Sequence, residues 1–399
     1  MPPSSADALT TAARRARAAG LERIHLIAWR DREHPEAGGS EVHASQVAGH
    51  WADAGFDVTL RTGAVPGQPA TTTRHGVRVV RHGGRTSVIP RTVTAEVLHR
   101  DGPRDGLVEI FHGFSFLAPA WATGPRIGVV HHVHLGAWRM QAPLPAAAVG
   151  HLLERFVVPR LYRSTLLAAL SPSTGQELVD LGLPADNVRI APPGVDDRFT
   201  PGDGRSPTPL IAAVGRLMPQ KGVDVALRVF AEVHRDHPDA RLEVVGDGPA
   251  RADLEALAHS LDLDGVVTFT GRVDDAELVD VYRRAWLVLN GSRREGWGMT
   301  LTEAGACGTP AVASAISGHV DAVIDGSTGL LAADEAGLAD AVRRLLDDPD
   351  ERRRLGDAAA ERAKGLRWDV VAATLLDTLA EDAERRRVST QEVHVRPDR

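Results

Sequence analysis

Short hydrophobic runs alternate with longer amphipathic segments along almost the whole chain. Runs of four to six apolar residues are typical of strands buried on both faces of a parallel sheet, and the segments between them predict helices that cover the sheet. In the first half, predicted strands cover 24–28, 58–60, 76–80, 108–111, 127–130, 166–170 and 188–191, and predicted helices cover 40–54 and 146–161. This order predicts strand–helix–strand units with right-handed crossovers.

The second half of the chain repeats the pattern. Predicted strands cover 210–214, 241–245, 266–269, 286–289 and 311–313, and predicted helices cover 223–236, two stretches within 336–364, and 368–387. A loop rich in proline, glycine and aspartate separates the halves at 201–209. We therefore expect an α/β protein with two doubly wound domains. The expected parts are an N-terminal arm over 1–22, domains over 23–196 and 205–366, and a disordered tail over 388–399.

The composition excludes several classes of function. The net charge of −7 gives the chain no overall positive field to attract nucleic acid. A single cysteine, Cys307, excludes an internal disulfide framework and a thiolate metal cage, and is read as a small buried residue. The sequence contains neither a long apolar span nor a secretory signal. We expect a cytoplasmic protein that makes at most peripheral contact with the inner face of the plasma membrane.

A glycine pair stands between the first predicted strand and its helix. Gly38 and Gly39 let the backbone approach a ligand closely, and the following helix N-terminus offers free N–H groups with partial positive charge. The pair predicts a site for a phosphate or for the charge that develops on a leaving group. A plain tight turn with Ser40 as the helix N-cap is the alternative.

Two cations follow the first predicted strand of the second half. Arg216 and Lys221 lie five residues apart in a glycine-bounded loop, where a guanidinium fork and an ammonium can converge on one diphosphate. Lysine occurs only at Lys221 and Lys364, whereas 44 of the 46 basic residues are arginine. The use of lysine at this place therefore favours a specific role over the alternative of two solvated loop cations.

The most specific pattern is a pair of glutamates that follows a predicted strand and enters a helix. Glu295 and Glu303 are separated by seven residues, and Gly296, Trp297 and Gly298 stand between them. A carboxylate accepts hydrogen bonds from two hydroxyls, so the pair is suited to hold two diols, one on a sugar ring and one on a ribose. A helix start with surface glutamates is the alternative.

These motifs, in this order, resemble the retaining glycosyltransferase family 4, whose members have the GT-B fold. The resemblance covers roughly residues 22–385, with further matches at Gly194-Val195-Asp196, Gly246-Asp247-Gly248-Pro249 and Gly271-Arg272-Val273. It implies two Rossmann-like domains that face a cleft, with the C-terminal helix crossing back to the first domain. Two positions depart from the pattern: Pro193 stands where many relatives have asparagine, and Trp297 stands where phenylalanine is more common.

The resemblance also implies roles for individual residues. Glu303 would bind the ribose hydroxyls, Glu295 a hydroxyl of the donor sugar, and Arg216 with Lys221 the diphosphate. His131 matches the cleft histidine beside the transferred sugar and joins Glu295, Arg216 and Lys221 as a catalytic candidate. The remaining donor-binding candidates are Gly38, Gly39, Gly296, Trp297, Gly298 and Val273.

Histidines gather after the predicted strand 127–130. The spacing of His131, His132 and His134 suggests a metal site as an alternative, but no carboxylate with suitable spacing accompanies them, and we expect no metal. The candidates for an acceptor pocket are His112, Phe114, His132, His134 and Trp138. Ordinary packing explains the aromatic residues equally well.

The sequence therefore predicts a hexosyltransferase that needs no cofactor and uses a nucleoside diphosphate sugar, with UDP or GDP favoured. Family membership implies retention, and the lack of an obvious carboxylate nucleophile favours front-face displacement, in which the departing phosphate accepts the acceptor's proton. The acceptor stays open among glycolipid, saccharide and small-molecule aglycone. No conspicuous amphipathic face with basic flanks is present, which favours a soluble acceptor or transient membrane contact. The alternatives are a nucleotide-sugar epimerase or hydrolase, and a non-catalytic nucleotide-sugar-binding homologue.

Overall fold

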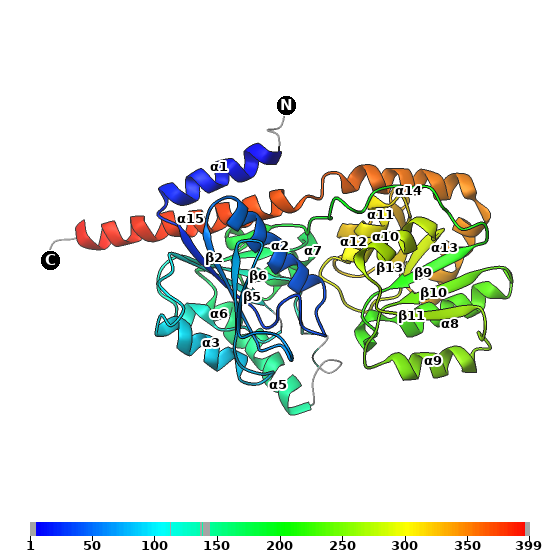
Figure 1. Ribbon diagram of the computed structural model, residues 1–399, viewed down its shortest axis with the longest axis horizontal. Coiled ribbons are helices and arrows are strands. Elements are labelled where there is room, and N and C mark those ends of the chain that lie inside the picture. Colours follow the sequence, from blue (N-terminus) through cyan, green and yellow to red (C-terminus); the bar gives the residue numbers. More distant parts are fainter. Residues whose placement is uncertain (1–4, 112, 136–137, 139–143, 396–399) are drawn as a thin grey trace. The chain divides into compact units, whose positions relative to one another are not determined.

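The computed structural model describes residues 5–111, 113–135, 138 and 144–395 of the chain (Figure 1). They form two compact units. Unit 1 comprises Met1–Gly194 together with Trp368–Arg399, and unit 2 comprises Val195–Arg367. Each unit is built on one sheet, mostly parallel in unit 1 and wholly parallel in unit 2, with helices around it, so the α/β class with two Rossmann-like domains is confirmed.

The sheet of unit 1 has the strand order β3-β4-β2-β1-β5-β6-β7-β8. Neighbouring strands are parallel except at the edge, where β3 runs antiparallel to β4. The order changes direction between β1 and β5, which is where open α/β sheets bind ligands. The strands are β1 (Arg23–Ile27), β2 (Asp57–Thr62), β3 (Thr71–Arg74), β4 (Val77–Arg81), β5 (Gly106–Phe111), β6 (Arg126–Val130), β7 (Leu166–Ala169) and β8 (Val188–Ile190).

Helices of unit 1 connect these strands and include both ends of the chain. They are α1 (Ser5–Ala18), α2 (Gly39–Asp53), α3 (Val88–Val97), α5 (Leu144–Leu152), α6 (Val158–Leu161), α7 (Pro172–Asp180) and α15 (Trp368–Val395). A π-helical turn, η2 (Leu153–Val157), joins α5 to α6, so residues 144–161 form one helical segment. Short 3-10 turns occur at η1 (Ala118–Ala120) and η3 (Ala185–Asn187).

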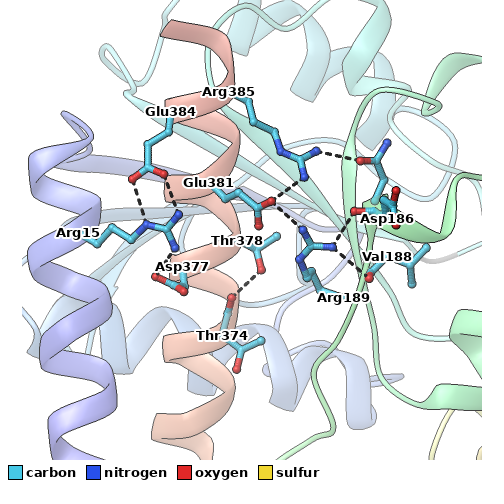
Figure 2. A network of polar contacts seen from close by, with 11 residues as sticks. Arg15, Asp186, Val188, Arg189, Thr374, Asp377, Thr378, Glu381, Glu384 and Arg385 are labelled. Carbon is cyan, nitrogen blue, oxygen red and sulfur yellow. Dashed lines mark hydrogen bonds and ion pairs between the residues drawn. The ribbon is translucent and has the colours of Figure 1, made fainter. Parts of the chain in front are cut away.

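Helix α15 lies beside α1 (Figure 1), and polar contacts tie it to its neighbours (Figure 2). The Arg15 guanidinium donates to both oxygens of Glu384, at 3.0 and 2.7 Å, and pairs with Asp377 at 3.0 Å. On its other side Glu381 accepts from Arg189 at 2.7 Å. The predicted N-terminal arm is therefore a packed helix from Ser5 to Ala18.

The final helix also differs from its predicted extent. It continues to Val395, beyond the predicted end at 387, and only residues 396–399 of the expected disordered tail lie outside the described residues. No glycine or proline interrupts 368–395, so the local sequence contains no signal to end the helix earlier.

The sheet of unit 2 has the order β11-β10-β9-β12-β13-β14, with every neighbouring pair parallel. Its strands are β9 (Leu210–Val214), β10 (Arg241–Val245), β11 (Val267–Gly271), β12 (Leu287–Asn290), β13 (Ala311–Ser314) and β14 (Gly329–Ala332). The order changes direction between β9 and β12, and this switch point determines where a ligand is expected.

Helices pack on the sheet of unit 2 and bury separate apolar clusters against it. One cluster centres on Phe230 and Val233 of α8, and another on Tyr282 of α10 and Leu301 of α11. The helices are α8 (Val223–His234), α9 (Arg251–Ser260), α10 (Asp275–Arg284), α11 (Met299–Ala306), α12 (His319–Ala322), α13 (Glu335–Asp347) and α14 (Pro349–Ala363), with a 3-10 turn η4 (Pro219–Lys221). Among the helices that the structure describes, none has both the length and the apolar character needed to span a bilayer.

Candidate active site

A partly buried ion pair lies at the switch point of unit 2. Lys221 ends the turn after β9, Glu295 lies in the loop after β12, and the Lys221 Nζ approaches Glu295 Oε1 at 2.5 Å. The Ser292 hydroxyl donates to the same oxygen at 3.1 Å. A pocket of about 10 Å³, enough space for about one water molecule, lies beside Lys221 and is lined by the ends of β9 and β12, the turns after them and the start of α8. The fold therefore brings together two predicted site residues that are 74 positions apart.

Glu295 is held in its charged form. Burial by itself raises the pKa of this carboxyl, but the charge of Lys221, then that of His319, and the hydrogen bonds from Lys221 and Ser292 outweigh it, so the pKa is lowered overall. An ionised carboxylate that still has an oxygen to share is a strong acceptor for a sugar hydroxyl.

His319 belongs to the same loop cluster, although the sequence analysis did not select it. It begins α12 after β13, its Nδ1 lies 3.0 Å from the Ser314 carbonyl oxygen, and burial lowers the pKa of its ring. Its Nε2 has no hydrogen-bond partner among the described residues. The available signal was its position, because it follows the carboxyl end of a predicted strand as the other site residues do.

Backbone packing holds the Glu295 loop against α12. Gly318 has a φ of +83°, and a Cβ at this position would stand 2.6 Å from the Gly296 carbonyl carbon. Gly298 has a φ of +99°, and a Cβ at this position would stand 2.9 Å from the His319 ring. The Trp297 side chain is buried, and its indole N–H has no hydrogen-bond partner among the described residues. Trp297 therefore contributes packing, and its neighbouring glycines allow the loop to approach α12 closely.

Glu303 lies on α11, in a different environment from Glu295. Its Oε2 accepts a hydrogen bond from the Tyr282 hydroxyl at 3.1 Å. Burial raises the pKa of Glu303 to about 7, although the bond from Tyr282 acts in the opposite direction. Val273 packs against the core cluster that contains Tyr282. Arg216 follows β9 and is partly exposed at the edge of the sheet that carries Lys221.

In unit 1, the Gly38-Gly39 turn begins α2 as predicted. Ser40, the alternative N-cap, does not cap the helix. Gly38 is the N-cap, and the buried Glu41 carboxylate accepts from the Gly38 N–H at 2.7 Å and from the Ser40 hydroxyl at 3.0 Å. Glu41 thus satisfies a donor at the helix N-terminus that would otherwise be left without a partner.

Two histidines and a tryptophan meet in unit 1. His131 follows β6, and its ring lies 5.1 Å from that of His43 on α2; the Trp368 ring, at the start of α15, lies 5.6 Å from the His43 ring on another side. Neither ring nitrogen of His43 has a hydrogen-bond partner among the described residues. Burial, then the neighbouring His131, lowers the pKa of His43 well below its ordinary value, so the ring is neutral. His131 is among the residues predicted from the sequence, whereas His43 and Trp368 are not.

Three of the five predicted acceptor residues lie in the loop after β6, and a fourth, Phe114, follows β5 and packs against them. The His132 and His134 rings stack at 4.0 Å, and the Trp138 ring lies 5.4 Å from His134 and 4.8 Å from Phe114. The fifth, His112, lies outside the described residues.

Glu154 of η2, which was not predicted, holds this loop in place through two hydrogen bonds. Its carboxylate accepts from the His134 backbone N–H at 2.6 Å and from the Trp138 indole N–H at 2.8 Å. His134 and Trp138 are buried, which leaves Phe114 and His132 as the partly exposed members of the group. Within the described part of the chain, no three His, Cys, Asp or Glu side chains are placed to hold a metal ion.

Comparisons with known proteins identify both halves of the chain. Residues 37–199 match the family model described as Glycosyltransferase Family 4, and residues 200–362 match Glycosyl transferases group 1. The D-inositol 3-phosphate glycosyltransferase of Kineococcus radiotolerans is 33% identical over 397 residues, covering 86% of this chain and 90% of that protein. D-inositol 3-phosphate glycosyltransferase 2 of Catenulispora acidiphila is also 33% identical, covering 88% of this chain and 91% of that protein.

Solved structures agree with the fold. A sucrose-phosphate synthase from Thermosynechococcus elongatus superposes with a TM-score of 0.79 at 23% identity, covering 92% of this chain and all of that chain. Anabaena Alr3699/HepE in complex with UDP-glucose superposes with a TM-score of 0.69 at 18% identity, covering 92% of this chain and 99% of that chain. The family models and the relatives together show that the chain belongs to glycosyltransferase family 4, with the GT-B fold, and is a glycosyltransferase.

Proposed function

We propose that the chain transfers a hexose from a nucleoside diphosphate sugar to an acceptor hydroxyl with retention at the anomeric carbon. The observation that carries the proposal is the Lys221–Glu295 ion pair at the switch point of the unit 2 sheet. A cation and a carboxylate held side by side at this edge suit a donor that presents a diphosphate next to sugar hydroxyls.

The donor-binding roles follow from the environments of the side chains. Glu295, whose pKa is lowered, stays ionised and accepts from a hydroxyl of the donor sugar. Glu303 accepts from the ribose hydroxyls, with Tyr282 orienting its carboxylate. Lys221 and Arg216 bind the diphosphate, which releases Lys221 in part from Glu295 and stabilises the charge on the leaving phosphate. UDP is the nucleotide to test first, because the similar Anabaena structure contains UDP-glucose.

Front-face displacement is the reaction that we propose. In this route the leaving phosphate oxygen accepts the proton of the acceptor hydroxyl, so no protein carboxylate forms a bond to the sugar. The protein contributes positioning and charge stabilisation, which together are worth several kcal/mol. His131, buried against the neutral His43, is assigned to a hydrogen bond with the sugar and not to general-base catalysis.

The acceptor is assigned to unit 1, with Phe114 and His132 as its partly exposed candidate contacts. The relatives named D-inositol 3-phosphate glycosyltransferase make a phosphorylated cyclitol the first acceptor to test. Saccharides, glycolipids and small-molecule aglycones form the other arms of the same screen.

The test combines donor binding with transfer by the purified chain. Calorimetry against UDP-, GDP- and ADP-linked hexoses identifies the donor, and NMR of the product establishes the anomeric configuration. The Glu303→Ala variant should weaken donor binding roughly 10- to 100-fold, because hydrogen bonds to a charged group are lost. The Lys221→Gln variant keeps a donor to Glu295 but removes the charge, so it should lower kcat on the order of a hundredfold.

Matched controls come from an exposed ion pair on and next to α14. Lys364 and Glu361 bind each other at the surface, so Lys364→Gln and Glu361→Ala should leave binding and kcat within about twofold of the wild type. Equal effects of the site and control variants would contradict the assignment. Donor cleavage at the same rate without any acceptor would favour a hydrolase, and an inverted product would exclude the retaining reaction.

A further inference from the structure

The helical segment 144–161, formed by α5, η2 and α6, buries its only carboxylate and exposes large apolar side chains. Its single carboxylate, Glu154, points inward, where it accepts hydrogen bonds from His134 and Trp138. Gly150 lies on the same inner side, and a Cβ there would stand 2.5 Å from the Trp138 ring. An ordinary surface helix buries its apolar face and turns its charges to water. In this segment the acid is buried, and large apolar side chains face outward.

Four large apolar side chains form this outward face. Leu144 is 72% exposed, Val149 51%, Leu152 55% and Phe156 51%. Val149, Leu152 and Phe156 are spaced three and four residues apart, so they lie along one stripe of the helix. Helix α5 lies at the periphery of unit 1 (Figure 1). A contiguous exposed apolar stripe of this kind marks an interaction surface more often than single exposed residues do.

Basic side chains border the stripe, whereas the sequence pattern predicted no amphipathic face with basic flanks. Arg155, Arg160 and Arg163 are exposed on the same helical segment and the turn after it, and no exposed acid lies between residues 144 and 163. None of the three arginines forms an ion pair with another described residue. The chain as a whole carries a net charge of −7, so this concentration of positive charge runs against the overall composition.

We propose that this outward face binds the surface of an anionic lipid bilayer. A stripe of leucine, valine and phenylalanine can enter the boundary between headgroups and acyl chains, while arginines on its flanks pair with lipid phosphates. The positive charge selects an anionic bilayer over a neutral one. Binding is peripheral and reversible, because the segment is short and its inner side stays packed on the protein through Glu154.

The inner side of the same segment connects the lipid contact to the loop after β6. Glu154 holds the backbone of His134 and the ring of Trp138, and these belong to the loop that begins at His131. A helix that rests on lipid thereby supports the loop assigned to the acceptor. The membrane contact itself is independent of the proposed function, because it depends only on the outward face.

The test is co-sedimentation of the full chain with vesicles of phosphatidylcholine alone and with about a third of phosphatidylglycerol. Two double variants separate the apolar contribution to membrane binding from the electrostatic one. Leu152→Gln with Phe156→Gln removes apolar area without changing charge, and Arg155→Gln with Arg160→Gln removes charge without changing the stripe. Each should lower the partition coefficient for anionic vesicles at least tenfold. Added salt should weaken wild-type binding over the range in which surface charges become screened.

The matched control is Val388→Gln on α15, because Val388 is as exposed as Leu152 at 55%. This variant should bind anionic vesicles within about twofold of the wild type. Absence of wild-type binding to anionic vesicles, or binding by both double variants equal to that of the wild type, overturns the proposal. Light scattering without vesicles tests a second copy as the occupant. If the wild type is a dimer and the Leu152→Gln with Phe156→Gln variant a monomer, the stripe pairs two copies, and the membrane proposal is wrong.

Discussion

The carboxyl group of Glu109 lies in the centre of β5 and should make the stability of unit 1 depend on pH. It is completely buried and accepts hydrogen bonds from the backbone N–H groups of Phe116 and Ala118 and from the Tyr162 hydroxyl, the last at 2.7 Å. Burial raises its pKa to about 7, and the hydrogen bond from Tyr162 opposes this only in part. The perturbation that we choose is Glu109→Gln, which keeps the shape and removes the titration.

The sign follows from the two pKa values of this group. Below pH 4.5 the carboxyl is protonated in both the folded and the unfolded chain, and its full contribution to stability is present. As pH rises, the unfolded chain ionises first, so the free energy of unfolding falls until the folded carboxyl also ionises near pH 7. The gap between 4.5 and about 7 corresponds to about 3.4 kcal/mol at 1.36 kcal/mol per pH unit. Roughly 2.5 kcal/mol of this loss falls between pH 5 and pH 8.

The Glu109→Gln variant loses this pH dependence, but its unfolding free energy is lowered by a constant amount. Its NH₂ group cannot accept the Ala118 N–H, which costs about 1–3 kcal/mol at every pH. The difference in unfolding free energy, wild type minus Glu109→Gln, should therefore fall by roughly 2.5 kcal/mol from pH 5 to pH 8. Other titrating groups are common to both proteins and cancel in this difference.

The assay is a urea titration read by pulsed hydrogen exchange, with each pulse applied at one fixed pH. Peptides from β5 and β6 report on unit 1 alone, so separate unfolding of the two units does not confuse the measurement. Tyr162→Phe is the companion variant: it removes a hydrogen bond that lowers the pKa of Glu109, and the pH-dependent loss should become larger. A difference between wild type and Glu109→Gln that stays constant within about 0.5 kcal/mol over this range would refute the reasoning.

Three further predictions concern the other features of the structure. Donor affinity should rise about tenfold from pH 6 to pH 8 in calorimetry, because Glu303, with a pKa of about 7, binds hydroxyls best when ionised, and Glu303→Gln should abolish the dependence. Gly318→Ala should lower the unfolding free energy by about 1–3 kcal/mol more than Gly326→Ala, since both have positive φ but only the first Cβ meets another backbone; equal melting temperatures would contradict this. Arg15→Ala should cost less than about 1 kcal/mol, since its ion pairs are partly exposed, and a larger loss in a urea titration would show that α1 depends on them.

Much of the architecture could be predicted because local patterns specify it. The strands β9 (Leu210–Val214) and β10 (Arg241–Val245) match the predicted ranges residue for residue, since β9 is a single apolar run and β10 a mainly apolar one, each between polar turns. The polar edge strand β3 (Thr71–Arg74) was missed, because it has no buried face to impose a hydrophobic pattern. Helix α3 (Val88–Val97) was also missed: it contains a proline in its first turn and several β-branched residues, which favour strands.

The candidate site, too, contains residues that the sequence indicated and contacts that it did not. Arg216, Lys221, Glu295 and Glu303 could be proposed as site residues because they lie after the carboxyl ends of predicted strands, and parallel sheets place those ends at one edge. No local pattern indicates that His43 meets Trp368, a residue 325 positions later, because the contact depends on the docking of α15 against α2.

The helical segment 144–161 shows where prediction from the sequence ends. The sequence alone indicated a helical segment rich in apolar residues, because its length and composition are local properties that outweigh Gly150 and Pro159 within it. Only the tertiary structure decided which side is buried, because the segment is apolar nearly all round and its orientation is set by Glu154 and Gly150 against Trp138. A buried carboxylate needs hydrogen-bond donors, and those donors come from a loop whose position the helix itself cannot specify. The local sequence thus determined the elements and the edge at which the chemistry gathers, and tertiary contacts determined which faces of those elements meet each other and which remain exposed.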